Sequence, residues 1–356
     1  MTTRAVPWGP VPAAEHRPQP GTRQLPYHRL GHADPEHRWW KPLVEFVVFG
    51  ASYLLLTVVL GIAWGGWVVA TRGEEALDEI FAEPTALDMM DPAVLLMVLL
   101  SVILMIPALL LARLLMGPRP VGLLLSVTGR LRWAFLARTA LLALAVYAAG
   151  HGLLLLLEYA ATGALPPVDP GEGFGWVVLM IVLLVPLQCA AEELVFRGYL
   201  LQSIGRWLRR PVFAILLPVP LFTFAHFYDV WGLLAVAAMA VVAGYLSWRT
   251  GGLEAAIALH VVNNVLAFSF GAVGWADPAP EESTWLSLAT GLPLYLVFAW
   301  LVVRSARTHG IEVTRTVRAS AGPVPPGVWA CPGPPACPGH WTAPPPAPPA
   351  APQRFP

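Results

Sequence analysis

Charged side chains are scarce in this sequence. Asp, Glu, Lys and Arg make up 12% of its 356 residues, whereas 56% are hydrophobic. In a soluble globular domain about a quarter of the residues are charged. This composition therefore excludes an ordinary soluble protein and predicts a chain with much of its surface in lipid. The net charge is zero, which removes any electrostatic reason to expect a nucleic-acid partner.

Cysteine is also rare, with three examples in the whole chain. Cys189 lies in an apolar run, where a small packing residue is expected. Cys331 and Cys337 lie in a proline-rich tail, and their spacing fits no standard zinc pattern. A disulfide or a metal clip between these two cysteines is therefore the less favoured alternative. The sequence also lacks an internal repeat, which many transporters contain.

Long apolar runs dominate the remainder of the chain. A helix needs about 20 apolar residues to span a bilayer. Eight segments are candidates, which predicts an all-α, polytopic transmembrane helix bundle of about eight spans. These segments are residues 46–70, 92–116, 139–157, 175–201, 211–227, 230–248, 253–270 and 286–303.

The polar segments between these runs alternate in charge. Because Lys and Arg collect in cytoplasmic loops, the basic segments are predicted to be cytoplasmic. Alternation at every crossing with both ends basic requires an even number of spans, so both termini are expected in the cytoplasm. The basic segments are 4–41, 113–138, 206–210, 249 and 304–318, and the acidic ones are 74–91, 158–172, 229 and 277–282.

The chain divides into five expected regions. The Pro-rich end is predicted to be disordered because it lacks the apolar content to fold. Gly61 and Gly65 form a GxxxG pattern, which fits packing within the chain or dimerisation, so the oligomeric state stays open. The regions are a polar N-terminal tail (1–43), three membrane spans (44–173), a catalytic membrane core (174–272), the last loop and span (273–310), and a Pro-rich tail (311–356).

Glu192, Glu193 and Arg197 lie inside the fourth apolar segment, in the run Glu-Glu-Leu-Val-Phe-Arg-Gly. A charge inside a bilayer is costly, so such residues are functional candidates. Glu193 precedes Arg197 by four residues, the favoured ion-pair order on a helix. That pair would neutralise Glu193 and leave Glu192 as a carboxylate that can act as a general base. The simpler interpretation is that both acids mark a helix end near the cytoplasm.

Two further polar patterns lie in later apolar segments. Phe222 and His226 are four residues apart in the fifth, and a single histidine there also fits an ordinary boundary residue. His260 and Asn264 are four apart in the seventh and project from one helix face. They fit metal binding, donation to an oxyanion, or a hydrogen bond to another helix. Asn263 points elsewhere and is expected to pack.

The three patterns together resemble the CAAX protease and bacteriocin-processing (CPBP) family of intramembrane proteases. That family includes type II CAAX prenyl endopeptidases and abortive-infection-type membrane proteins. Its pattern is Glu-Glu-x-x-x-Arg, Phe-x-x-x-His and His-x-x-x-Asn, all present here in this order within residues 175–270. Each motif is weak alone, but the ordered triple inside apolar segments is specific.

The resemblance implies an all-α membrane bundle whose site lies in a cavity open toward the cytoplasm. It implies a peptidase, an intramembrane endopeptidase that hydrolyses a peptide bond with activated water. Glu192 is similar to the family's catalytic base, and His226 to the residue that holds the water with it. His260 and Asn264 are similar to the residues that stabilise the oxyanion.

Glu193 and Arg197 are similar to residues that orient the site, which agrees with their helical spacing. The family is often described as metalloproteases, although a metal-free glutamate mechanism is equally arguable. Two imidazoles and a carboxylate can hold zinc, so Glu192, His226 and His260 are candidate metal ligands. The sequence does not decide between these mechanisms.

The predicted spans leave Glu192 nearer the cytoplasm and His226 nearer the outer side. We expect the fourth helix to be longer and tilted, and to extend to about Arg206, rather than the fifth helix to enter less deeply. The expected location is a bacterial plasma membrane, with lipid and a membrane-bound protein or peptide substrate as partners. The alternatives are a non-catalytic membrane immunity or chaperone protein and a proton-coupled transporter.

Overall fold

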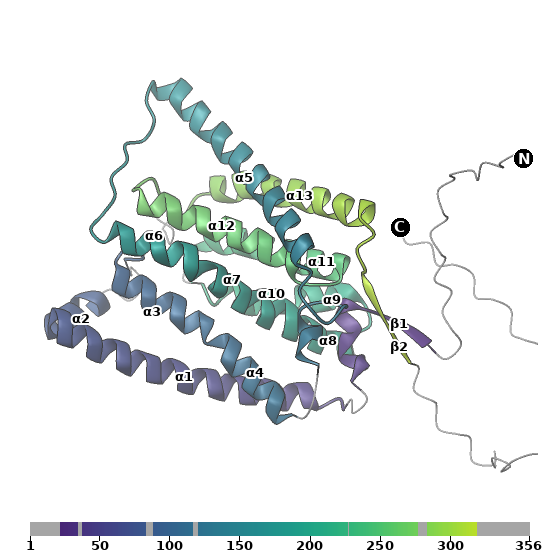
Figure 1. The fold of residues 1–356 in the computed structure, drawn as a ribbon. Coiled ribbons are helices and arrows are strands. Elements are labelled where there is room, and N and C mark those ends of the chain that lie inside the picture. Colours follow the sequence, from purple (N-terminus) through teal and green to yellow (C-terminus); the bar gives the residue numbers. More distant parts are fainter. Residues whose placement is uncertain are drawn as a thin grey trace, which may run out of the picture. The chain divides into compact units, whose positions relative to one another are not determined.

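A computed structural model describes most of the chain as a helical bundle (Figure 1). The predicted Pro-rich tail beyond residue 318, with Cys331 and Cys337, lies outside the described residues, as does the start of the N-terminal tail. The described residues are 22–34, 38–82, 88–116, 120–226, 228–276 and 283–318.

Seven helical segments of the described chain are long and apolar enough to cross a membrane. The prediction of an all-α, polytopic membrane bundle is thereby confirmed. The segments are α1 (Lys41–Arg72), α3 with α4 (Pro92–Ile103, Met105–Leu115), α5 (Trp133–Thr162), the run from Phe174 to Trp207, α11 (Val230–Thr250), α12 (Glu254–Ala272) and α13 (Trp285–Thr308).

The fifth predicted span is shorter than expected. Residues 211–227 were predicted to cross the bilayer, but the helix covers only Pro211–Thr223, as α9 (Pro211–Leu216) and α10 (Pro218–Thr223). At about 1.5 Å per residue this helix is about 20 Å long, less than the hydrocarbon core of about 30 Å. Prolines within the run remove backbone donors and favour the break.

The two ends of the described chain pair with each other. Strand β1 (Thr22–Pro26) runs antiparallel to β2 (Thr314–Arg318), with Thr22 opposite Arg318. Strand β1 lies in the segment expected to be a polar N-terminal tail, and β2 lies at the start of the segment expected to be a disordered Pro-rich tail. The expectation of disorder was therefore wrong for Thr314–Arg318, because these residues pair with β1. Pairing requires both strands to lie at one end of the bundle. The chain between them must therefore cross the membrane an even number of times. Seven crossings are the long helices, and the segment with α9 and α10 supplies the eighth.

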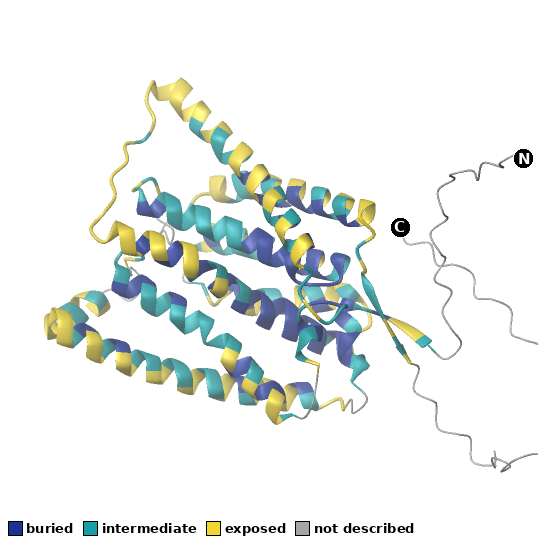
Figure 2. Ribbon diagram, viewed as in Figure 1, coloured by how far each residue is buried: buried dark blue, intermediate teal, exposed yellow. Residues whose placement is uncertain are grey.

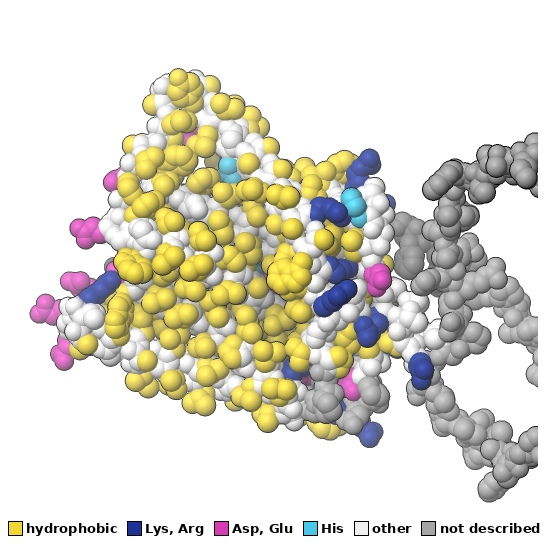
Figure 3. Space-filling model, viewed as in Figure 1, with side chains coloured by type: hydrophobic (Ala, Val, Ile, Leu, Met, Phe, Trp, Pro, Cys, Tyr) yellow, Lys and Arg dark blue, Asp and Glu magenta, His cyan; other side chains and the backbone are white. Residues whose placement is uncertain are grey.

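Charges divide between the two ends of the bundle, while apolar side chains cover the side that Figure 3 shows. Figure 2 shows many exposed residues along the outer helices, so this apolar surface is open to lipid. One end, here called the basic end, carries β1, β2 and the Arg-rich connections. The opposite acidic end carries α2 (Glu74–Ala82) and the described parts of the connections that precede α3, α6, α11 and α13. This separation is the one predicted from the loop charges.

Segments from distant parts of the sequence cover the basic end. The short 3-10 helix η1 (Tyr27–Ala33) packs against α8 (Leu201–Trp207), and the Tyr27 hydroxyl donates to the Leu124 carbonyl. Arg29 Nη1 donates to the Gly205 carbonyl at 2.7 Å. Beside them, Arg132 forms an ion pair of 2.6 Å with the buried Glu254 at the start of α12. The contacts of η1 join the N-terminal segment to the core helices, whereas the Arg132–Glu254 pair joins the start of α5 to α12.

Gly205 is required by the close approach of η1 to α8. A Cβ at this position would overlap the carbonyl oxygen of His28, which is backbone and cannot rotate away. We expect Gly205→Ala to lower the free energy of unfolding by about 1–3 kcal/mol, the usual range for overpacking. Gly152→Ala on α5 is the matched control, since a Cβ there meets nothing within 4 Å. Denaturation midpoints in detergent compare the two, and equal midpoints would contradict the prediction.

Candidate active site

The fourth apolar segment is one helical run with a local change of winding. It comprises α6 (Phe174–Leu183), α7 (Val185–Glu193), the π-helix η3 (Leu194–Leu200) and α8. The run ends at Trp207, which agrees with the longer fourth helix expected from sequence. The π-helical turns begin directly after Glu193, and such turns occur frequently at functional sites.

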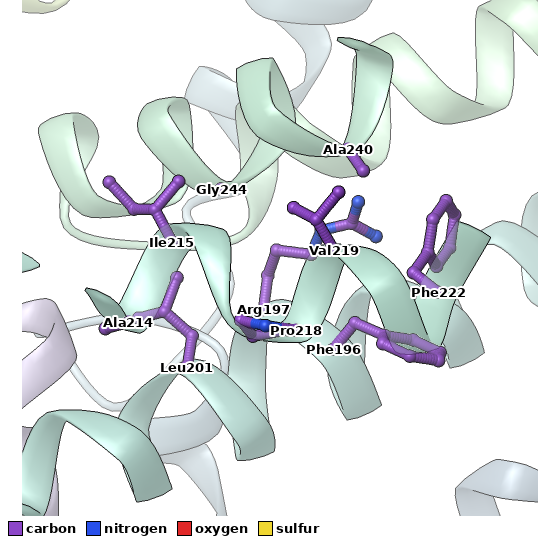
Figure 4. Close-up of a pocket in the computed structure, with 10 residues that line it drawn as sticks. All are labelled: Phe196, Arg197, Leu201, Ala214, Ile215, Pro218, Val219, Phe222, Ala240 and Gly244. Atoms are coloured by element: carbon purple, nitrogen blue, oxygen red, sulfur yellow. The ribbon is translucent and has the colours of Figure 1, made fainter. Parts of the chain in front are cut away.

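Glu193 is the centre of the buried charge cluster. Its side chain is fully buried, and Oε1 accepts from Arg197 Nη1 and from His260 Nδ1, both at 2.9 Å. The ion pair expected from the spacing of Glu193 and Arg197 is therefore present. Arg197 also lies over the Phe222 ring, with its guanidinium carbon 4.2 Å from the ring centroid. Figure 4 shows this side chain among apolar residues of α9, α10 and α11.

Glu192 faces a different set of partners. Gln188, one helical turn earlier, donates from Nε2 to Glu192 Oε2 at 2.8 Å. His260 Nε2 lies 3.4 Å from the same oxygen. His260 is 1% exposed and bridges the two carboxylates, since its Nδ1 contacts Glu193. The sequence led us to expect a Glu192 carboxylate without partners. In the structure it instead accepts from Gln188 and lies beside the His260 imidazole.

His260 Nε2 and Glu192 Oε2 can share one proton. A carboxylate only accepts hydrogen bonds, so His260 Nδ1 must carry the hydrogen that is donated to Glu193. In neutral imidazole, Nε2 is then an acceptor that faces the acceptor Oε2 of Glu192. A proton on either atom makes this contact attractive. The pair can therefore take up and return a proton within the site.

His226 lies just beyond the end of α10. Its Nδ1 lies 2.9 Å from the Phe222 carbonyl oxygen, which can only accept, so Nδ1 carries the hydrogen. Nε2 of the neutral ring is then an acceptor, available to a water or a substrate group. The Phe222 and His226 rings also pack with their centroids 5.0 Å apart. The structure has no direct hydrogen bond between the described side chains of His226 and Glu192.

Amide side chains continue the network from α12 to α5. The Tyr147 hydroxyl donates to Asn263 Oδ1 at 3.0 Å, and Asn263 Nδ2 donates to Asn264 Oδ1 at 3.1 Å. Asn264 Nδ2 in turn lies 3.5 Å from Gln188 Oε1, a long contact. The expectation that Asn263 merely packs was wrong, because it connects Tyr147 to the site. The long contact leaves the Asn264 amide able to move toward a ligand.

A cavity of about 340 Å³ brings these groups together. Four of the six predicted site residues line it, namely Glu192, His226, His260 and Asn264. The other two do not line it: Glu193 contacts His260, and Arg197 contacts Glu193.

Sequence reasoning missed Gln188 and Tyr147 as parts of the site. Gln188 could have been found, since it is a polar residue in an apolar run one helical turn before Glu192. Tyr147 could not have been found, because it is a single tyrosine in an apolar helix and lies outside the three polar motifs.

The candidate zinc ligands do not form a preformed metal site. Among the described residues, no three His, Cys, Asp or Glu side chains lie together in a group that could hold a metal ion. His260 is engaged by both glutamates, and His226 lines the same cavity without a direct hydrogen bond to the described Glu192 side chain.

Comparison with known proteins finds a family model and a relative that match part of the chain. Residues 174–266 match the family model described as "Type II CAAX prenyl endopeptidase Rce1-like". The uncharacterized protein YyaK of Bacillus subtilis (strain 168) is 35% identical over 104 residues, which are 27% of this chain and 35% of YyaK. The match thus spans about a third of that relative's length. No solved structure matches.

The matched segment contains all three polar motifs, from Glu192 through His226 to His260 and Asn264. The resemblance inferred from these motifs is therefore confirmed: residues 174–266 carry the sequence pattern of the Rce1-like, CPBP-type family.

Proposed function

We propose that this protein is an intramembrane endopeptidase that hydrolyses a peptide bond of a membrane-associated protein or peptide. The observation that carries the proposal is that Glu192, His226, His260 and Asn264 line one cavity inside an apolar bundle. A carboxylate base, imidazoles and an amide donor are the groups that such hydrolysis needs. The match to the Rce1-like family supports the same reaction class.

In the proposed reaction, Glu192 removes a proton from a water held between its carboxylate and His226 Nε2. The water oxygen bonds to the carbonyl carbon, and the carbonyl oxygen becomes an oxyanion. Glu192 then returns the proton to the leaving nitrogen as the carbon–nitrogen bond breaks. His260, fixed by Glu193, buffers the proton on Glu192 through the 3.4 Å contact.

The oxyanion is stabilised by the Asn264 amide in this scheme, with His260 beside it. Among the described residues, the hydrogen bond of Asn264 Nδ2 is the long 3.5 Å contact to Gln188, so moving to a substrate oxygen costs little. One donor of this type contributes roughly 10²- to 10³-fold to the rate in other hydrolases. Glu193 and Arg197 are positioning residues, because they act through His260 and do not line the cavity.

The test is cleavage of a library of membrane-anchored peptides by the purified protein in detergent, with mass spectrometry locating new termini. Wild type is compared with Glu192→Ala and His226→Ala at equal amounts of folded protein. We expect both substitutions to abolish cleavage. Cleavage that survives both would overturn the assignment. A chelator arm on wild type, with zinc added back, decides whether the active protein needs a metal.

Two other functions fit the same residues less well. A proton-coupled transporter needs a path through the bundle, but the cavity wall ends at Glu192 and His260, and the groups beyond them toward the basic end are buried. A non-catalytic immunity or chaperone protein has no need for several charged groups buried in its core, which are costly to retain. Neither alternative accounts for the cluster of acid, base and amide groups in the wall of the cavity.

Gln188→Leu is expected to slow cleavage without unfolding the protein. The substitution removes the amide that donates to Glu192 Oε2 at 2.8 Å. A hydrogen bond to a charged group contributes about 1.5–3 kcal/mol, so we expect a loss of about 10- to 100-fold in kcat and a shifted pH–rate profile. Gln202→Leu is the matched control, since this buried Gln in the same helical run donates to the Leu123 carbonyl and does not line the cavity. An unshifted pH–rate profile in Gln188→Leu would contradict the assigned role.

A further inference from the structure

The walls of the cavity belong to one half of the bundle. On α11 they run from Gly232 to Met239, within the first half of that helix, and on α12 from His260 to Phe268 toward its last turns. On α13 they include Ser287, in the first turn. All of these stretches lead toward the acidic end. None of the described lining residues comes from the connections at the basic end.

The basic end is closed by packed chain. Along η3 and α8 nearly every residue from Leu194 to Arg206 is buried, and Gln202 Nε2 donates to the Leu123 carbonyl at 2.8 Å. Leu253 N–H donates to the Leu125 carbonyl at 2.9 Å, which attaches the segment before α5 to the start of α12. The described part of the chain therefore offers a substrate no route to Glu192 through this end.

The two ends carry opposite charge. Among the described residues of the acidic end, Arg72 is the single Lys or Arg. Asp229 stays ionised there, because backbone N–H groups of Gly232 and Ser283 lower the pKa of its carboxyl. Loops rich in Arg remain on the cytoplasmic side of bacterial membranes, so the charge separation places the acidic end outside the cytoplasm.

We propose that the site takes its substrate from the extracytoplasmic side. On the proposed peptidase function, the substrate is then an apolar segment of a membrane-anchored or exported protein that enters between α3, α11 and α13. The apolar lining fits aliphatic side chains, and the acidic surroundings favour neutral or basic residues over acidic ones at the outer flank of that segment. This opening is opposite to the cytoplasmic opening that the family resemblance implied.

Single cysteines on the intact protein test this route without requiring cleavage. Cys189, Cys331 and Cys337 are first replaced by Ala in the full chain. Ser287→Cys and Thr308→Cys then mark the two ends of α13, and Ala235→Cys marks the cavity wall on α11. A charged, membrane-impermeant maleimide is applied to spheroplasts, before and after permeabilisation.

We expect Ser287→Cys and Ala235→Cys to react in intact spheroplasts, and Thr308→Cys only after permeabilisation. Ala235→Cys that reacts only after permeabilisation, or never, overturns the extracytoplasmic route. Reversed labelling of the α13 pair overturns the orientation. Because labelling does not depend on hydrolysis, these outcomes are separate from a failure of the peptidase assignment, which the Glu192→Ala and His226→Ala comparison reports.

Discussion

Replacing Glu192 with Gln is expected to lower the rate of cleavage by about 10²- to 10⁴-fold, the usual contribution of a general base. Gln has nearly the same shape as Glu, and its carbonyl oxygen can still accept the hydrogen bond from Gln188 at the position of Oε2. The substitution therefore removes the basic group and leaves the packing. Initial rates on a cleaved peptide, with substrate binding measured separately, give the effect on kcat.

The matched control is Glu158→Gln, an exposed carboxylate on α5 at the acidic end. This variant carries the same change in charge and is expected to cleave like wild type. The denaturation midpoint of Glu192→Gln should stay near that of wild type. A variant that keeps at least half of the wild-type rate would show that Glu192 is not the base and would direct attention to Glu193 or His260.

The bundle was predictable because its signals are local or repeat along the chain. Apolar runs of about 20 residues and alternating loop charges identified seven full helices and the common end of both termini. The short helix at Pro211–Thr223 was overestimated, because apolar composition continues past the point where the helix stops. Pairing of β1 with β2 joins residues almost 300 positions apart through two five-residue strands, and no sequence periodicity specifies such a pair.

The site was predictable where helical spacing decides the contact. Glu193 with Arg197, and Phe222 with His226, interact one turn apart as expected. The contact of His260 with both glutamates joins two helices, so its geometry depends on how α7 packs against α12. The π-helical turns after Glu193 gave no sequence signal either. Motifs thus named the residues, whereas the fold determined which of them meet.

Glu193→Leu is expected to be among the most destabilising single substitutions in the described core. It leaves the Arg197 guanidinium buried without its carboxylate and removes the partner of His260 Nδ1. Breaking a buried ion pair by removing one partner costs about 3–5 kcal/mol. Denaturation midpoints in detergent measure this loss, and Glu158→Leu on the exposed face of α5 is the control that should change little.

The double variant Glu193→Leu with Arg197→Met separates stability from chemistry. Two apolar side chains of similar volume often replace a buried ion pair at little cost, so the double variant should recover much of the stability lost in Glu193→Leu. It still cannot fix His260, whose Nδ1 has lost its acceptor. We therefore expect a folded protein with strongly reduced cleavage. Recovery of both stability and cleavage would show that the pair serves the fold alone. A double variant that is no more stable than Glu193→Leu would mean that the lost interactions lie outside the pair.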